Sequence, residues 1–127
     1  MQVLIVEDDE SIRQIFRYMF RGTGHDVIYT EHLTEAADKL KDLKECALLI
    51  TDYKLPEGLC VDFAREFRAK FPRAGLLVVT GAHGIEDELR TLDGLDHANV
   101  LHKPFDMDDT IKIIELALKA YGEKSRP

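Results

Sequence analysis

The chain has 127 residues, of which 45% are hydrophobic and 32% are charged, with a net charge of −7 at pH 7. This composition fits one globular domain, argues against a nucleic-acid-binding surface, and offers no apolar run near the roughly 20 residues that span a bilayer. Because Met1 leads directly into a strand pattern, we expect no secretory signal. The two cysteines, Cys46 and Cys60, show no metal-type spacing, so we expect buried, reduced thiols in a cytoplasmic protein.

Apolar runs typical of strands alternate with helical periodicity along the chain. The strand-like runs lie at 3–6, 26–30, 46–51, 76–80 and 99–102. The helix-like segments, with apolar residues at i, i+3 and i+4, lie at 12–20, 33–40, 60–71, 85–92 and 113–121. Pro72 follows the third of these helices, and the fourth breaks near Gly94. We expect one domain over 1–121 and a frayed tail over 122–127.

Five strands alternating with five helices predict a parallel sheet with helices on both faces. The strands are nearly continuous apolar runs, as expected where both faces of a sheet are buried. In such open sheets, ligands bind beyond the carboxyl ends of the strands, where the winding reverses. The prediction is therefore an α/β fold of the flavodoxin-like kind, a (βα)5 doubly wound five-stranded parallel sheet with strand order 2-1-3-4-5.

Reactive side chains stand at the carboxyl ends of four of these strands. Glu7 and Asp8 follow the first strand, and Asp52 follows the third. Thr80 ends the fourth strand, and Lys103 follows the fifth. Three neighbouring carboxylates repel one another, and Mg²⁺ removes that cost while completing its shell with water and phosphate oxygens. An ammonium and a hydroxyl nearby suit a phosphoryl group, so this set predicts a magnesium site that receives one.

Asp52 is the residue that we expect to attack phosphorus. Its strand ends at the centre of the predicted sheet, with Thr80 and Lys103 on neighbouring strands. Formation of an aspartyl phosphate is an established form of covalent catalysis, and it depends mainly on positioning and charge neutralisation. Asp9, by contrast, is interpreted as a helix cap. His83 follows Thr80 in the same loop and could border the crevice.

Four segments together resemble the receiver domain of two-component response regulators, and the resemblance covers about 1–121. They are Val3–Glu10 (VLIVEDDE), Leu49–Pro56 (LITDYKLP), Val78–Gly81 (VVTG) and Lys103–Phe105 (KPF). The resemblance implies a signalling switch rather than an enzyme, one that promotes its own phosphorylation and dephosphorylation. It implies a sensor histidine kinase or a histidine phosphotransfer protein as donor, and a downstream protein target or an effector domain as output.

The resemblance also assigns roles to individual residues. Asp52 is the implied phosphoacceptor, and Glu7, Asp8, Asp52 and the backbone carbonyl of Lys54 are the implied Mg²⁺ ligands. Thr80 is implied to hydrogen-bond the phosphoryl group, and Lys103 to pair with it. The peptide bond between Lys103 and Pro104 is expected to be cis.

Three positions depart from the family pattern. Val100 stands where the family often has an aromatic residue that responds to phosphorylation, so we expect the threonine–aromatic relay to be absent or rerouted. Cys60 stands where a glycine is common, four residues after Pro56, which predicts a rearranged turn. Gly81 stands where alanine is frequent, and together with the nearby Gly84 it predicts a pliant loop.

Two other functions stay open on sequence grounds. A receiver-like protein-binding module that works without phosphorylation is compatible with Val100 and Cys60. A small phosphohydrolase with an aspartyl-phosphate intermediate is disfavoured, because Lys54 stands where the best-known superfamily of this kind has a second acid.

Overall fold

A computed structural model describes residues 1–82, 84–92, 95 and 97–124 of the chain. The main strands are β1 (Gln2–Val6), β2 (Asp26–Thr30), β3 (Leu48–Asp52), β6 (Gly75–Thr80) and β7 (Asn99–His102). The helices are α1 (Glu10–Phe20), α2 (Leu33–Asp42), α3 (Val61–Lys70), α4 (Ile85–Arg90) and α5 (Met107–Lys124). None of the described helices is both long and apolar enough to cross a membrane.

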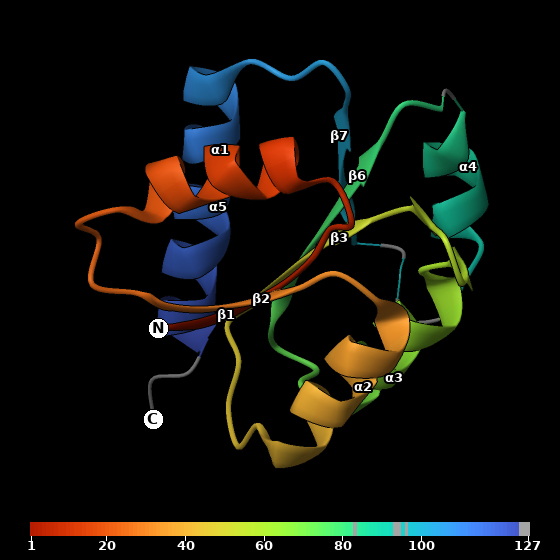
Figure 1. Cartoon of the computed structure of the whole chain (residues 1–127). Coiled ribbons are helices and arrows are strands. Elements are labelled where there is room, and N and C mark those ends of the chain that lie inside the picture. The colour runs from red at the N-terminus through yellow and green to blue at the C-terminus, as the bar shows by residue number, and fades with distance from the viewer. Residues whose placement is uncertain (83, 93–94, 96, 125–127) are drawn as a thin grey trace.

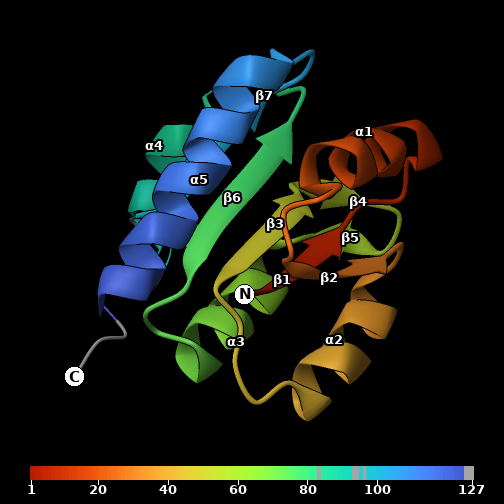
Figure 2. The ribbon, with the colours of Figure 1, turned by 90° about the vertical axis from the view of Figure 1, so that its left-hand side faces the viewer.

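The five main strands form one parallel sheet in the order β2-β1-β3-β6-β7. Counted along the chain without the two-residue strands β4 (Lys54–Leu55) and β5 (Gly58–Leu59), this is the predicted order 2-1-3-4-5, so the fold prediction is confirmed. Figure 2 shows β6, β3, β1 and β2 side by side, with β3 central. The winding reverses between β1 and β3, and the carboxyl ends of these two strands are therefore neighbours.

Helices cover both faces of the sheet and create two apolar layers. Helices α2, α3 and α4 lie on one face, and α1 and α5 lie on the other (Figure 1). Alternate strand residues point into opposite layers: Leu4 and Leu49 belong to the first, Ile5 and Ile50 to the second. These four side chains are at most 1% exposed, which explains why the strands are apolar without interruption. The sheet is therefore packed on both faces, and the carboxyl ends of its strands lie at one edge of this core.

The first helix begins as predicted. The side chain of Asp9 accepts a hydrogen bond from the backbone N–H of Ser11 at 2.9 Å, which confirms its interpretation as a cap. Cys46 and Cys60 are both buried and free, as expected. Burial raises the pKa of the Cys46 thiol to about 11 and that of the Cys60 thiol to about 12. Both thiols are therefore neutral at physiological pH.

The turn after Asp52 contains a small hairpin that the sequence did not predict. Strands β4 (Lys54–Leu55) and β5 (Gly58–Leu59) pair antiparallel. Gly58 has φ 138°, a conformation that favours glycine. At the tip, Glu57 accepts hydrogen bonds from the backbone N–H groups of Leu33 and Thr34, at 2.7 and 3.1 Å. The hairpin thus caps α2 from outside the helix.

Two predicted boundaries differ from the structure. Helix α5 continues to Lys124, so the segment that we expected to fray from residue 122 is helical over its first three residues. Gly122, which is unfavourable in a helix by about 1 kcal/mol relative to alanine, is accommodated within α5 and does not end it. Helix α4 ends at Arg90, two residues earlier than predicted. The predicted break at Gly94 and the predicted place of His83 lie outside the described residues.

Candidate functional site

The acidic side chains meet at the carboxyl edge of the sheet because β1 and β3 are neighbours. Val6 of β1 pairs with Thr51 of β3. The next residue on each side, Glu7 and Asp52, therefore lie at the same level of the sheet. Glu7, Asp8 and Asp52 each present a carboxylate oxygen, and these atoms lie within 4.8 Å of one another. Glu7 is 1% exposed and Asp52 is 8% exposed, whereas Asp8 is open to solvent. The structure therefore brings together the three acids that the sequence singled out.

Lys103 reaches this acidic crevice from the end of β7. Its Nζ lies 3.2 Å from Asp52 Oδ2 and 3.5 Å from Glu7 Oε2. The backbone N–H of Lys103 donates to the carbonyl oxygen of Thr80 at 2.7 Å, which fixes the start of this segment to β6. The following Lys103–Pro104 peptide bond is cis, as expected. The ammonium group is thus placed against two of the three carboxylates.

Thr80 completes the set at the end of β6. It is 3% exposed, and it lies next to Asp52 in the sheet because Asp52 pairs with Val79. The Thr80 Oγ1 accepts a hydrogen bond from the backbone N–H of Ala82 at 2.9 Å. The hydroxyl therefore ties down the chain that leads to α4, and it retains a proton with which to donate.

Burial and mutual repulsion dominate the electrostatics of the acids. Burial, followed by repulsion from Asp52, raises the pKa of Glu7 to about 7. Burial also raises the pKa of Asp52, although Lys103 opposes this effect. Burial alone would lower the pKa of Lys103, but attraction to Glu7 and Asp52 outweighs it and the pKa is raised. One ammonium group therefore does not compensate the buried negative charge of this crevice.

The crevice fits a hard divalent cation. Glu7 Oε2 is buried and accepts no hydrogen bond from the described residues, and its ion-pair partner Lys103 is 3.5 Å away. A buried carboxylate oxygen without a hydrogen bond lowers the stability of the folded state unless a cation binds it. The donors are all carboxylate oxygens, and one of them is exposed, which suits Mg²⁺ with its preference for few carboxylates and several waters.

Arg13 is a supporting residue that the sequence analysis missed. Its side chain is buried, and its Nη1 donates to the backbone carbonyl of Glu7 at 2.6 Å. Its Nη2 pairs with Glu10 and, at 3.2 Å, with Glu31. A signal was present, because Arg13 shares the buried face of α1 with Phe16, three positions later. A charged residue on an apolar helix face indicates a paired, structural role.

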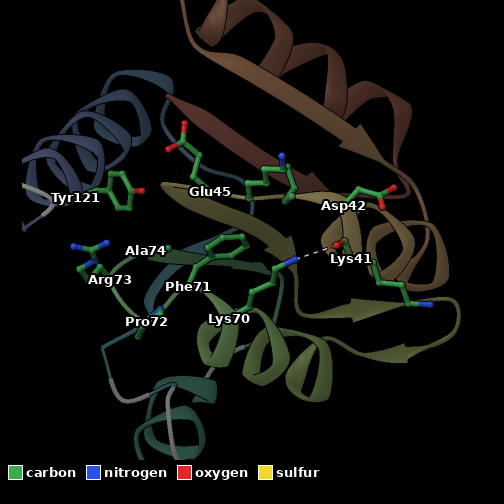
Figure 3. Close-up of a pocket in the computed structure, with 11 residues that line it drawn as sticks. Lys41, Asp42, Glu45, Lys70, Phe71, Pro72, Arg73, Ala74 and Tyr121 are labelled. Atoms are coloured by element: carbon green, nitrogen blue, oxygen red, sulfur yellow. Dashed lines mark hydrogen bonds between the residues drawn. The ribbon is translucent and has the colours of Figure 1, made fainter.

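The crevice differs from a hollow of about 840 Å³ at the opposite end of the sheet. That hollow lies between the segments that precede β3 and β6, with Tyr121 of α5 beside it (Figure 3). Its basic side chains are exposed or already used: Lys70 Nζ donates to the carbonyl oxygens of Leu40 and Lys41. None of the acids at the carboxyl edge lines it.

Comparison with known proteins gives one consistent result. A family model described as "Response regulator receiver domain" matches residues 3–115. The cell cycle response regulator CtrA of Brucella ovis is 30% identical over 119 residues, which are 94% of this chain and 50% of that protein. The chain therefore spans about half the length of the curated relatives that it matches.

Solved structures agree in fold. A response regulator receiver domain protein from Methanospirillum hungatei JF-1 superposes with a TM-score of 0.84, at 22% identity and 98% coverage of both chains. A receiver domain protein from Clostridium thermocellum superposes with a TM-score of 0.76, at 25% identity, covering 93% of this chain and 94% of that one. With the family model matching nearly the whole chain and the fold in agreement, this protein belongs to the response regulator receiver domain family.

Proposed function

We propose that this protein is a phosphorylation-dependent switch of a two-component phosphorelay, in which Asp52 accepts a phosphoryl group from a phosphohistidine. The observation that carries the proposal is the contact between Lys103 Nζ and Asp52 Oδ2 at 3.2 Å, in a crevice shared with two further acids. A buried carboxylate beside a fixed ammonium group is a nucleophile whose product can be neutralised at once.

The proposed step forms one bond and breaks one. A carboxylate oxygen of Asp52 attacks phosphorus while the P–N bond of the phosphohistidine breaks, and the imidazole nitrogen keeps the bonding pair. The product is an acyl phosphate on Asp52. Lys103 pairs with one phosphoryl oxygen, and the Thr80 hydroxyl turns to donate a hydrogen bond to another. Water reverses the modification at the same site, so the domain promotes its own phosphorylation and dephosphorylation.

We assign the metal site to Glu7, Asp8, Asp52 and the backbone carbonyl of Lys54. The two buried acids and the exposed Asp8 supply the carboxylate oxygens within 4.8 Å of one another. Lys54 follows Asp52 by two residues, in β4. Mg²⁺ bound there supplies the positive charge that the three carboxylates and the incoming phosphoryl group together require.

The proposed partners follow from this chemistry. A sensor histidine kinase or a histidine phosphotransfer protein supplies the phosphoryl group, in the cytoplasm. The output passes to a downstream protein or to an effector domain, since the curated relatives are about twice as long as this chain. The net charge of −7 gives no support to direct nucleic-acid binding by this domain.

The test is the intact mass after incubation with Mg²⁺ and a small phosphodonor such as acetyl phosphate. We expect the gain of one phosphoryl group in the wild-type protein and no gain in Asp52→Asn. Asp9→Asn is the matched control, because Asp9 is a neighbouring exposed acid that caps α1. A gain that survives Asp52→Asn contradicts the assignment. No gain in any variant favours a binding module that works without phosphorylation.

A further inference from the structure

Helix α4 has little to hold it in place by itself. It spans only six residues, and its N-cap, Gly84, provides no side-chain hydrogen bond. Helices of this length are marginal in water, so α4 depends on contacts with the rest of the protein. Ile85 and Leu89 supply an apolar contact with the layer beneath, which α2 and α3 share (Figure 1).

Two acids of the first turn attach α4 to the sheet. Tyr53 donates its hydroxyl to Glu88 Oε2 at 3.1 Å. His102 contacts Glu86 Oε1 through its Nε2. Asp87, which stands between the two acids, instead pairs with Arg90 of the same helix at 3.3 Å. Three consecutive acids thus divide into two that bind strand residues and one that binds within the helix.

The two strand residues stand directly beside the reactive ones. Tyr53 follows Asp52, and His102 precedes Lys103. The backbone of Tyr53 is fixed on both sides, because its N–H donates to Val79 and its carbonyl accepts from Cys60, each at 2.8 Å. Tyr53 thus follows directly on β3, which ends in the phosphoacceptor, and His102 is the last residue of β7, where it pairs with Thr80 directly before Lys103.

The alternation of side chains along β7 explains why His102 can take this part. Val100 pairs with Val78, and His102 pairs with Thr80, so both side chains point to the α4 face of the sheet. Val100 has no polar atom with which to contact α4. His102 lies one pleat nearer the acidic crevice, and it provides the polar contact that an aliphatic residue at position 100 does not.

Thr80 links this arrangement to the chemistry. Its Oγ1 accepts from the N–H of Ala82, three residues before α4 begins. If the hydroxyl turns toward a phosphoryl group on Asp52, that hydrogen bond is strained or lost. We propose that the contacts Tyr53–Glu88 and His102–Glu86 form a two-point attachment that holds α4 in the unphosphorylated position and yields when Asp52 is phosphorylated.

This inference rests on the proposed function, and the experiment separates the two. The variants are Glu86→Ala with Glu88→Ala together, and Asp87→Ala as the matched control on the same helical turn. Alanine favours helix at least as well as these acids, so a loss of order in the double variant does not reflect propensity. Tyr53→Phe removes a single hydroxyl from the strand side.

Hydrogen exchange of the α4 amides is the first readout, with intact mass measured on the same samples. Without phosphodonor, we expect exchange in the double variant to be about threefold to tenfold faster than in wild type, and Asp87→Ala to stay within about twofold. Tyr53→Phe should show part of the increase and should add nothing to Glu88→Ala. With phosphodonor, exchange in wild type should rise toward that of the unmodified double variant.

The initial rate of phosphorylation is the second readout. If the attachment opposes the modified state, the double variant should gain its phosphoryl group about two- to fivefold faster than wild type and Asp87→Ala should not. Equal exchange in the double variant and the control overturns the attachment, whatever the mass shows. A gain of mass without any change at α4 overturns the coupling alone, and no gain of mass overturns the proposed function alone.

Discussion

Lys103 and Asp52 lie 51 positions apart in the chain, yet the Nζ of one is 3.2 Å from Oδ2 of the other. The contact exists because β3 and β7 both pair with β6, one on each side. The long lysine side chain then spans the end of β6 and reaches the carboxylate. The last residue of β3 and the residue after β7 are thereby joined, although β6 separates the two strands.

Removing the Lys103 ammonium should slow phosphorylation strongly. In Lys103→Ala, the developing negative charge on the phosphoryl group loses a fixed partner, and we expect the initial rate with acetyl phosphate and Mg²⁺ to fall by about tenfold or more. Time-resolved intact mass measures it. The control is Lys54→Ala, which removes an exposed ammonium near Asp52 and keeps the backbone carbonyl. Equal rates in the two variants would contradict the role of Lys103.

Neutralising Glu7 should stabilise the metal-free protein at neutral and higher pH. The pKa of Glu7 is raised from 4.5 to about 7, so the folded state holds a proton that the unfolded state has already released. Stability therefore falls as pH rises from about 4.5 to about 7. In EDTA at pH 8, we expect Glu7→Gln to unfold with a free energy about 2 kcal/mol higher than wild type.

The same linkage fixes the control for Glu7. At pH 4.5 or below, the carboxyl is protonated in the folded protein, and the difference between Glu7→Gln and wild type should shrink toward zero. Thermal unfolding followed by circular dichroism at pH 4.5, 6 and 8 measures the trend. If the difference in stability between Glu7→Gln and wild type stayed constant across this pH range, the buried charge of Glu7 would not be the cause of that difference.

Mg²⁺ should raise the unfolding temperature of wild type in a concentration-dependent way. A ligand that binds only the folded state adds about 2.7 kcal/mol when its free concentration is a hundred times the dissociation constant. Asp8→Asn should weaken this response, because it removes the exposed carboxylate of the three. Asp9→Asn should leave it largely unchanged, since Asp9 is bound to Ser11. An identical response in all three proteins would locate the metal elsewhere.

Glu57 should contribute to stability from outside the helix that it caps. The backbone N–H groups of Leu33 and Thr34 lose their acceptor in Glu57→Ala, and we expect about 1 kcal/mol of destabilisation in urea unfolding. His32, the residue before α2, provides no side-chain cap of its own. Glu66→Ala, on the neighbouring helix α3, is the surface control. If Glu57→Ala and Glu66→Ala lower the free energy of unfolding by the same amount, the hydrogen bonds that Glu57 accepts from α2 do not contribute to stability.

The parts of the structure that follow local patterns were predictable. The inner strands β1, β3 and β6 were visible because each is buried on both faces, which leaves an unbroken apolar run such as Leu48–Ile50. The three acids, Thr80 and Lys103 were found because each stands where such a run stops. Since parallel strands end at one edge, their meeting followed from the strand order without any knowledge of side-chain contacts.

The parts that depend on contacts between distant residues were not predictable. Glu57 and Leu33 are 24 positions apart, and Tyr53 and Glu88 are 35 apart. No periodicity connects such pairs, so neither the cap of α2 nor the attachment of α4 could be inferred. The end of α5 was missed for a different reason, because Gly122 is a common helix-ending residue and the structure keeps it within the helix.

The external cap on α2 connects the hairpin that follows Asp52 to the first turn of a distant helix. Leu59, in the same hairpin as Glu57, is 47% exposed and provides an apolar contact point in the turn that follows Asp52. A protein that binds Leu59 and displaces the hairpin would also move Glu57, the hydrogen-bond acceptor, away from the first turn of α2. Displacement of this hairpin would therefore remove the cap from a helix that begins 24 positions before Glu57.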